Sequence, residues 1–479
     1  MVPISFSSTA YLWSLVGLTI LLYTTRRSRQ RFRLLLPLPP GPKKLPIVGN
    51  LFDVPADRPW EAYQQWNKDF RDRWRRQRKM FHEAFHAGAV KQFDPQIRDS
   101  THRLLRRLLR DPHDLMGHFR HLAGALIMDV TYGIDVESLD DPYIKIAEEA
   151  LHGLAIACVP GTFMVVRLAS YPAHQDTQTH FQDLIPALKY VPSWFPGAEF
   201  KRKARQWRDV THELVEAPFT EVKRNVAAGT APFSFTSLNL GLLAESDSGS
   251  KRGAVKEKDI KETAAASHAA GADTTTSAMG TFALAMLKNP DAQKKAQAEL
   301  DAVIGHGNLP ELGDAPALPY VSAIVKEVLR WENVAPIGIP HRLLVEDEYR
   351  GFRIPENSIV IGNEMYPDPK SFKPERFLLG GKLNSDVRDP EAVIFGFGRR
   401  ICPGRHMAYS SLWLTIASIL ATFDINKAVD NDGNVIEPSY EYSAAVIFTP
   451  LPFKCSVTPR SPRAAQAIEA TVGGKCYFK

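Results

Sequence analysis

One segment of the sequence, VIFGFGRRICPGRHMAYSSLW at residues 393–413, concentrates side chains that could do chemistry. It sets a single cysteine, Cys402, between a glycine-containing bend and an apolar stretch with helical character. Pro403 suits the first position of a helix, which would place the sulfur at a helix N-terminus. Unpaired N–H groups and the helix dipole favour a thiolate there, and Arg400 and Arg405 add positive charge.

Three chemistries are open to such a cysteine. It could be a nucleophile, a redox thiol or an axial ligand of haem iron, because a thiolate is one of the few groups with which proteins hold haem. The first two roles lack a convincing partner, since His406 lies on the same expected helix. The other cysteines are Cys158, Cys455 and Cys476. They lie far apart without a C-x-x-C spacing, which argues against a disulfide framework and against a structural zinc site.

The elements that must position this cysteine are mainly helical. Helical patterns cover residues 72–85, 98–111, 258–289, 290–305 and 318–333. Residues 348–363 read as a hairpin and residues 439–460 as short strands. Strands and helices do not alternate, which argues against a doubly wound sheet. The expected fold class is therefore mainly α with small β-sheets.

The composition is that of a globular enzyme. The chain has 479 residues, of which 44% are hydrophobic and 23% charged. The net charge of +6 is small for this length and spread along the chain, so no nucleic-acid partner is expected. Basic faces could still serve an acidic protein or a membrane surface.

The N-terminus predicts a membrane anchor. Residues 1–25 carry no charged side chain, and about 20 apolar residues suffice to span a bilayer. Five arginines follow between Arg26 and Arg33, which by the positive-inside rule keeps the remaining chain on the cytosolic side. A cleaved signal peptide or a buried helix is the alternative. The prolines of residues 37–46 then form a stiff spacer.

The cysteine segment resembles the haem-binding signature of the cytochrome P450 family. The pattern F-x-x-G-x-R-x-C-x-G is filled here by Phe395, Gly398, Arg400, Cys402 and Gly404. Five fixed residues in ten positions make this a specific match. The resemblance implies that Cys402 binds the iron of haem b, and that the other four belong to the cofactor site. It also implies a P450-like fold, a triangular and mostly helical body with an N-terminal transmembrane helix.

Two weaker motifs resemble the family's structural charge cluster. KEVLR supplies Glu327 and Arg330, which share one helix face, and PERF supplies Arg376. Taken alone, a Glu and an Arg at this spacing usually form an exposed pair of little value. The resemblance implies that these three side chains form a buried triad, which ties the helix to the loop that leads to the cysteine.

AGADTT, at residues 270–275, resembles the family's oxygen-activating segment. Small residues at Ala270, Gly271 and Ala272 would let the helix pass close to the haem. The resemblance gives Asp273 and Thr274 the catalytic role of delivering protons through water. A helix turn with a solvent-facing Asp273 is the structural alternative.

The haem propionates need cations. WRRQR matches the family's W-x-x-x-R, so Trp74 and Arg78 are expected at one propionate. His341 and Arg400 are expected at the other, with Arg342 as the alternative to His341. The neighbouring basic residues, Arg75, Arg76 and Lys79, form either a solvated face or part of a docking patch for a reductase.

The resemblance implies a membrane-bound monooxygenase of the microsomal type, similar to fungal enzymes of secondary or xenobiotic metabolism. Such an enzyme inserts one oxygen atom from O2 into a lipophilic substrate. Its electrons come from NADPH through a separate NADPH-cytochrome reductase, with cytochrome b5 as an additional partner. The expected location is the endoplasmic reticulum membrane, with a single span and the catalytic domain on the cytosolic side. The pocket is expected to be apolar, lined by Ala266, Ala270, Ile337, Ile339, Ile447 and Phe448.

The expected organisation is a membrane anchor at residues 1–25, a basic and Pro-rich hinge at 26–50, a haem-thiolate catalytic domain at 51–460 and a tail at 461–479. Relative to the family, segments are missing before Trp74 and after Asn363, and residues 165–182 look like an insertion. Errors in a gene model or a spliced variant would explain these breaks.

Two other functions compete with the monooxygenase. One is a haem-thiolate isomerase or dehydratase, which does not use O2, and the intact pair Asp273 and Thr274 counts against it. The other is an inactive, truncated haem or membrane scaffold protein, which the missing segments favour.

Overall fold

The structure of the chain is a computed structural model. It describes residues 73–158 without 139, 192–195, 198–246, 256–336, 338, 341–342, 347–349, 351–354, 359–360, 366–443 and 447–472. Within these ranges no helix is long and apolar enough to cross a membrane. The expected anchor at 1–25, the hinge at 26–50 and the insertion at 165–182 lie outside the described residues.

The predicted fold class, mainly α with small β-sheets, is confirmed. A helix over residues 73–85 comes first. It is followed by η1 (Ala89–Phe93), α3 (Asp94–Arg110), α4 (Leu115–Tyr132), α5 (Pro142–Cys158), α6 (Glu199–Ala227), α7 (Phe235–Ser246), α8 (Glu257–Lys288), α9 (Pro290–Val303), η3 (Leu312–Ala317), α10 (Pro319–Trp331), η4 (Pro374–Phe377), α11 (Glu391–Ile394), η5 (Gly398–Arg400), α12 (Arg405–Thr422) and α13 (Pro462–Glu469).

The strands of the described residues are short and pair only two by two, always antiparallel. The pairs are β1 (His341–Arg342) with β4 (Ile359–Val360), β2 (Asp347–Tyr349) with β3 (Phe352–Ile354), β5 (Leu378–Leu379) with β6 (Lys382–Leu383), and β7 (Phe423–Lys427) with β8 (Cys455–Pro459). The hairpin expected at 348–363 is therefore shorter, because residues 359–360 pair with β1 instead.

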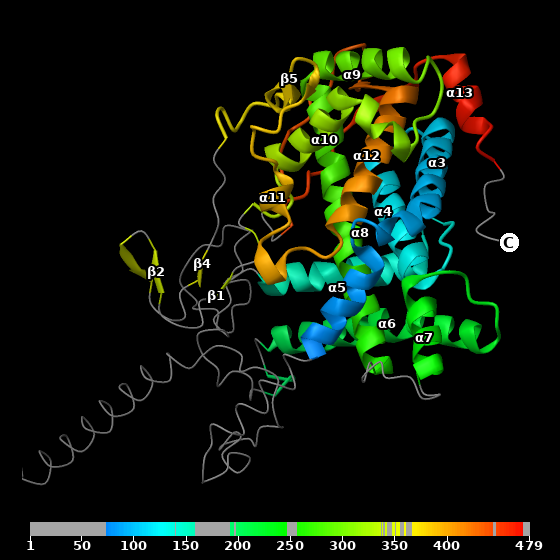
Figure 1. Cartoon of the computed structure of the whole chain (residues 1–479), viewed down its shortest axis with the longest axis vertical. Helices are drawn as coiled ribbons and strands as arrows, with labels where there is room; N and C mark the ends of the chain where they lie inside the picture. The colour runs from blue at the N-terminus through cyan, green and yellow to red at the C-terminus, as the bar shows by residue number, and fades with distance from the viewer. Residues whose placement is uncertain are drawn as a thin grey trace, which may run out of the picture.

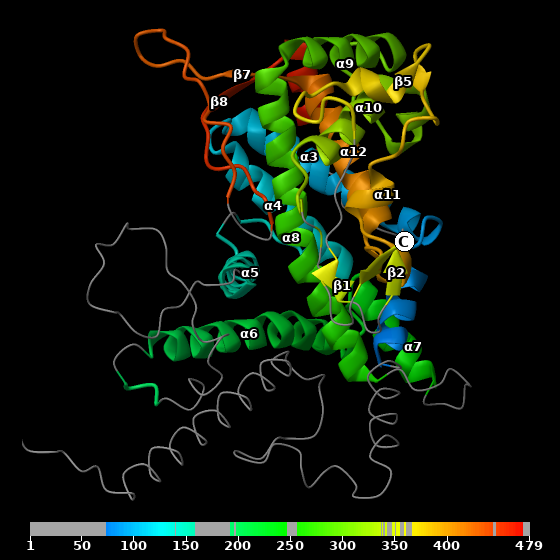
Figure 2. The same cartoon turned by 90° about the vertical axis from the view of Figure 1, so that its left-hand side faces the viewer.

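The long helix α8 runs the height of the body, from α9 at one end to α6 and α7 at the other (Figures 1 and 2). Its start is fixed by Asp259, whose carboxylate accepts the backbone N–H of Lys256 at 3.3 Å. Its end is fixed by Asn289, whose side chain donates to the carbonyl of Ala285 at 2.9 Å before Pro290 opens α9. Between these ends α8 packs against α4, α10 and α12.

Two glycines of α8 let α4 approach closely. A Cβ at Gly271 would lie 2.8 Å from the side chain of Ile127, and one at Gly280 would lie 2.8 Å from that of Met116. Real Cβ atoms do not approach other atoms so closely, so a larger residue at either position would require its neighbour to move, which the branched Ile127 does less easily than the flexible end of Met116. The first glycine lies in the segment that the sequence singled out for its small residues.

A histidine is buried at the same interface. His268 of α8 is 1% exposed and meets Tyr132 of α4 edge to face, with ring centroids 6.1 Å apart. Among the described residues neither ring nitrogen of His268 finds a partner, nor does the Tyr132 hydroxyl. Burial lowers the pKa of His268 to about 4, because the charged form loses its hydration.

We expect this histidine to make the fold acid-sensitive. Its folded pKa of about 4 lies below its ordinary value of 6.5, so the unfolded chain binds the proton first as the pH falls. The free energy of unfolding should be unaffected by this group above about pH 6.5 and should decrease by up to about 3 kcal/mol toward pH 4. Urea unfolding of His268→Leu should show a flatter acid limb than the wild type. His212→Leu, at an exposed position of α6, is the control, and equal acid limbs for the wild type and H268L would contradict the prediction.

Candidate active site

The loop that carries Cys402 is closed by its own backbone. The N–H of Cys402 donates to the carbonyl of Phe395 at 2.7 Å, and the N–H of Ile401 donates to that of Gly398 at 3.2 Å. Gly396 and Gly398 have φ values of 75° and 55°, a left-handed conformation that glycine adopts without strain. The bend predicted from the glycines is therefore present.

The helix after the cysteine begins later than predicted. Its first residue is Arg405 and its N-cap is Gly404, so Pro403 lies in the preceding turn rather than at the first helical position. The sulfur still receives a hydrogen bond from the backbone of Gly404. Proline has the same fixed φ in the turn before a helix as at the first helical position. The sequence therefore could not distinguish these two positions for Pro403.

Burial raises the pKa of the Cys402 thiol above its ordinary value. The hydrogen bond from Gly404 and the positive charges of Arg78 and Arg405 oppose this rise without cancelling it. The backbone N–H and the arginine charge thus favour the thiolate in the predicted direction, but burial of the thiol outweighs them and raises its pKa. A bound metal cation reverses this balance, since a coordinating thiol is deprotonated outright.

Cys402 lines a cavity of about 410 Å³, within the size range of small-molecule and cofactor sites. One wall is the small-residue face of α8, with Ala266, Ala270 and Gly271. A second wall is the cysteine loop with the start of α12. The remaining lining residues include Phe81 and Phe85 of the first described helix and Ala123, Leu126 and Ile127 of α4.

The two predicted catalytic residues differ in their placement. Thr274 lines the cavity, and its hydroxyl donates to the carbonyl of Ala270 at 2.8 Å. Asp273 does not appear among the described residues that line the cavity. Burial raises the pKa of Asp273, with Arg120 opposing the rise and Glu148 reinforcing it.

The predicted propionate residues gather at the cavity as well. Trp74, Arg78 and Arg400 all line it, and the Arg400 guanidinium lies 4.4 Å from the centre of the Trp74 ring. Burial lowers the pKa of Arg78 and the nearby Cys402 opposes this shift. His341 lies in β1, and its side chain is outside the described part of the chain.

The sequence missed the wall formed by Phe81, Phe85 and α4. The i, i+4 spacing of the two phenylalanines predicts that they share a helix face, but not what that face contacts. Conversely, two residues expected at the pocket do not line this cavity. Phe448 stacks on Tyr442 with ring centroids 4.6 Å apart, and Ile447 lies beside it in the chain. Ile337 and Ile339 lie outside the described residues.

Comparison with known proteins identifies this arrangement. A model of the family described as "Cytochrome P450" matches residues 58–457. The chain belongs to the cytochrome P450 family. It is 38% identical to cytochrome P450 monooxygenase 98 of Postia placenta, over 92% of this chain and 93% of the relative. It is 35% identical to cytochrome P450 monooxygenase ple1 of Rhodocybe pseudopiperita (96% and 95% covered) and 34% identical to tryptamine 4-monooxygenase of Psilocybe cyanescens (95% and 98% covered). The chain is thus a fungal-type P450 and an oxidoreductase of the monooxygenase class.

The alignment of this P450 with a relative contains internal gaps. The match to the Postia placenta enzyme extends over 508 positions, more than the 479 residues of the chain, so it contains gaps opposite this P450. The gaps agree with missing internal segments. Their placement before Trp74 and after Asn363 remains a prediction.

The P450 family implies a haem cofactor, and the residues of the cavity fit one. A thiol stands on one wall, small residues of α8 form another, and two arginines with a tryptophan face the cavity where acidic groups would need partners. A Cβ added at Gly404 would meet no atom within 4 Å, so the cavity is open directly beside the cysteine. Thiolate, apolar walls and cations are the donor set that a haem with two propionates requires.

The predicted charge triad of the P450 forms, and it is buried. Glu327 is 0% exposed, and its carboxylate accepts hydrogen bonds from Arg330 at 2.6 and 2.9 Å and from Arg376 at 3.0 and 3.1 Å. The backbone N–H of Lys373 donates to the same carboxylate at 2.6 Å. Arg330 also donates to the carbonyls of Pro369 and Ser371, at 2.8 and 3.0 Å. The triad therefore fixes the segment after residue 366 to α10.

We expect Glu327→Gln to lower the free energy of unfolding by about 3–5 kcal/mol, because two arginines would lose their common counter-charge in a buried site. Urea unfolding measures the change. Glu257→Gln is the matched control, because Glu257 pairs with Lys223 at 2.9 Å on the surface, where such pairs contribute about 0–1 kcal/mol. An equal decrease in the free energy of unfolding in the two variants would show that the buried triad stabilises the fold no more than a surface ion pair.

Proposed function

We propose that this P450 is a haem-thiolate monooxygenase that inserts one oxygen atom from O2 into a lipophilic substrate, with electrons from NADPH through a reductase. One observation carries the proposal: Cys402 borders a cavity whose other walls are the small-residue face of α8 and a cluster of cations. The competing thiol chemistries would need a base or a second cysteine at Cys402. Among the described residues that line the cavity there is no histidine and no second cysteine, and its one carboxylate, Glu262, is paired with Arg73.

In this proposal each predicted residue has a place. Cys402 binds the iron of haem b, and Phe395, Gly398 and Gly404 shape the loop around the sulfur. Trp74 and Arg78 hold one propionate, while Arg400 and His341 hold the other. When bound, the haem supplies the oxygen-activating chemistry, and the protein supplies binding, orientation and control of water.

Thr274 and Asp273 would manage protons. Thr274 lines the cavity and its hydroxyl donates to the Ala270 carbonyl, so its oxygen can accept a hydrogen bond from a water that carries the proton. The raised pKa of Asp273 lets its carboxyl carry a proton nearer to neutral pH than an exposed aspartate could. This intact pair favours the monooxygenase over an isomerase or dehydratase.

The cavity wall favours a lipophilic substrate. Four of the five serine and threonine hydroxyls on its described wall donate within their own helices: Thr263 to Asp259 at 2.6 Å, Ser267 to Thr263 at 2.9 Å, Thr274 to Ala270 at 2.8 Å and Ser411 to Ala408 at 3.0 Å. Since these donors are occupied, the wall offers a ligand mostly carbon surface. A compound of secondary or xenobiotic metabolism fits this chemistry.

The decisive experiment is the carbon monoxide difference spectrum of the reduced protein. We expect the wild type to show the red-shifted Soret band of thiolate-ligated haem, and Cys402→Ser to lose it. Cys455→Ser is the matched control, because Cys455 is a second partly buried thiol, in β8, whose pKa burial raises to about 11.

We also propose that residues 1–25 anchor the chain in the endoplasmic reticulum membrane. The full chain should therefore sediment with membranes, and the chain that lacks residues 1–25 should not.

Each result separates the proposal from its competitors. A thiolate band without NADPH-dependent turnover would favour the isomerase or dehydratase. No haem band in the wild type would favour the inactive scaffold. A band that persists in C402S would contradict ligation by Cys402. Sedimentation that is independent of residues 1–25 would contradict the anchor.

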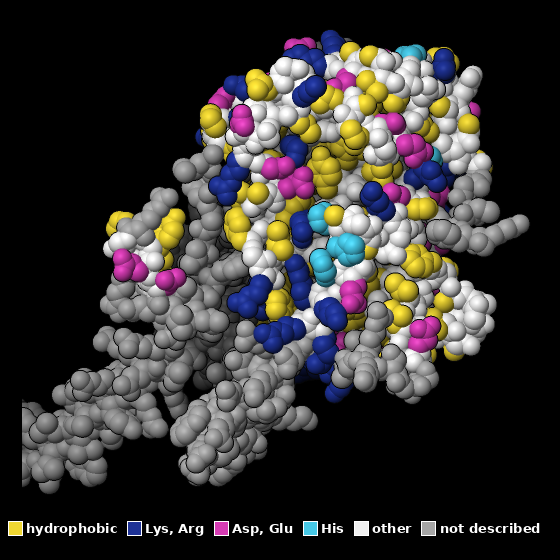
Figure 3. All heavy atoms as spheres, in the orientation of Figure 1, with side chains coloured by type: hydrophobic (Ala, Val, Ile, Leu, Met, Phe, Trp, Pro, Cys, Tyr) yellow, Lys and Arg dark blue, Asp and Glu magenta, His cyan; other side chains and the backbone are white. Residues whose placement is uncertain are grey.

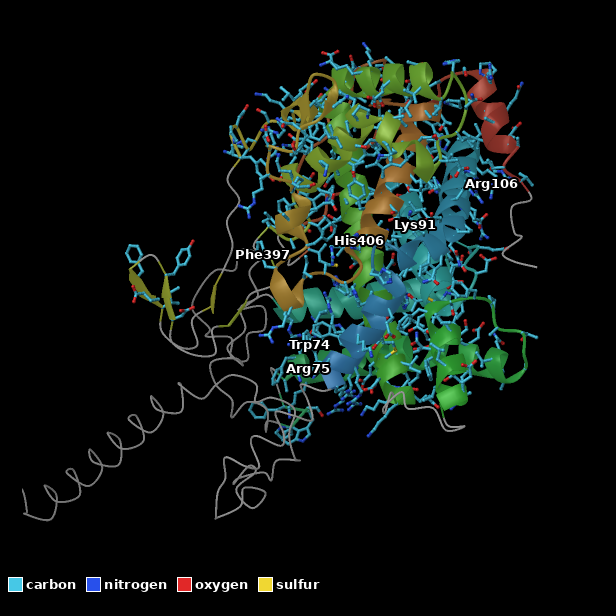
Figure 4. All side chains as sticks on the ribbon, viewed as in Figure 1. Trp74, Arg75, Lys91, Arg106, Phe397 and His406 are labelled. Atoms are coloured by element: carbon cyan, nitrogen blue, oxygen red, sulfur yellow. The ribbon has the colours of Figure 1, made fainter. Side chains whose placement is uncertain are left out.

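We further propose that the reductase docks on the face that carries the cysteine loop. Figure 3 shows Lys and Arg side chains around a group of histidines on this face, and Figure 4 labels Arg75, Phe397 and His406 there. Phe397 is 50% exposed, and Arg75, Arg399 and Arg400 are exposed. Such a basic surface attracts an acidic electron-donor protein, with cytochrome b5 as an additional candidate.

Reversing one charge on this face should slow electron transfer. Arg399→Glu should reduce the rate of NADPH-dependent haem reduction several-fold at low ionic strength, because steering depends on the local field. High salt should narrow the difference. Arg208→Glu, at an exposed position of α6 beside Asp209, is the control. An unchanged rate in R399E, or an equal loss in R208E, would speak against docking at the cysteine loop.

A further inference from the structure

A second charged cluster lies one residue before the triad on α10. The ammonium group of Lys326 forms an ion pair with Asp389 and lies 3.3 Å from the carboxylate of Glu391. It also lies 5.7 Å from the centre of the Tyr409 ring. Only 12% of the Lys326 side chain is exposed, so it is held more firmly than a surface lysine.

The two carboxylates belong to the segment that immediately precedes the cysteine loop. Asp389 accepts the backbone N–H of Glu391, the first residue of α11, at 3.0 Å. This helix ends at Ile394. The next residue is Phe395, whose carbonyl receives the N–H of Cys402. Lys326 therefore holds the entry to the loop against α10.

The exit from the loop is tied to α10 at the same level. Tyr409 lies in the second turn of α12, with its ring beside Lys326. One turn further on, the indole N–H of Trp413 donates to the Ser322 hydroxyl of α10 at 2.9 Å. Both arms of the cysteine loop are thus fixed to one helix, and Lys326 contacts both.

The charges make this arrangement sensitive to loss of the lysine. Burial raises the pKa of Glu391, and Lys326 and Arg405 oppose this rise, while Asp389 reinforces it. Without Lys326, two neighbouring carboxylates would lack their nearest cation, and one of them is largely buried. Repulsion and desolvation would then favour movement of α11 away from α10.

We propose that Lys326 is a positioning residue for the Cys402 thiolate. It acts through Asp389, Glu391 and Tyr409, which keep the loop in the geometry that presents the sulfur to the cavity. The adjacent Glu327 holds a different segment, the one after residue 366. Consecutive residues of α10 therefore fix two separate parts of the site. The inference rests on the proposed haem-thiolate function.

The test compares Lys326→Met, Lys326→Arg and Lys223→Met in the full haem-loaded chain. Lys223 is the matched control because it joins two helices through Glu257 on the surface. The measurement is the carbon monoxide difference spectrum over time, read as conversion of the thiolate-type band to the band of a neutral ligand. We expect K326M to convert on the order of tenfold faster than the wild type, which is within the range of coupling in such networks. K326R should convert at nearly the wild-type rate, and K223M should match the wild type.

A spectral readout separates positioning from general stability, since a purely structural loss would lower the yield of protein without changing the ligand. Wild-type conversion in K326M, or equally fast conversion in K223M, would overturn the inference. If K326M does not fold, Glu391→Gln tests the same cluster with its charge removed and its shape kept, and conversion at the wild-type rate would again overturn it. Absence of the thiolate band in every protein, the wild type included, would overturn the proposed function instead.

Discussion

The rest of the site depends on a carboxylate that has no access to water. Glu327 is accommodated in the core because two guanidinium groups and one backbone N–H donate hydrogen bonds to its oxygen atoms. Each arginine also donates hydrogen bonds to backbone carbonyls of the segment after residue 366. Movement of this segment would therefore leave several guanidinium N–H groups and carbonyl groups unpaired. The ion pair between Glu327 and Arg330 within α10 thereby helps to fix the segment after residue 366 to this helix.

Opposing effects act on the ionisation of the Cys402 thiol. Burial opposes its ionisation, while the Gly404 N–H and the nearby arginines favour it. The protein alone does not resolve this competition in favour of the thiolate. A bound metal cation would favour the thiolate and so overcome the effect of burial. The small and apolar residues of the cavity walls leave space for a flat cofactor beside the sulfur.

The helices that carry these features form one continuous core. α4, α8, α10 and α12 pack on one another, and the family motifs lie on them or directly beside them. The gaps relative to known P450 monooxygenases therefore coexist with an intact set of motifs. The charge triad and the cysteine loop are both formed in this core.

The sequence by itself determined the class of fold, the members of the triad and the helices at 73–85, 94–110, 257–288, 290–303 and 319–331. Periodicity and residue spacing are local properties that the chain carries directly, whereas α4 to α7 were not predicted from it. The sequence motifs also predicted that Cys402, Thr274 and the cations around Trp74 belong to one site, and these residues line the same cavity. Only the tertiary structure decided that Phe81 and Phe85 form a wall, that Asp273 lies off the cavity and that burial raises the pKa of Cys402. These facts depend on which distant helix covers each side chain, and burial by a distant helix leaves no pattern in the neighbouring residues.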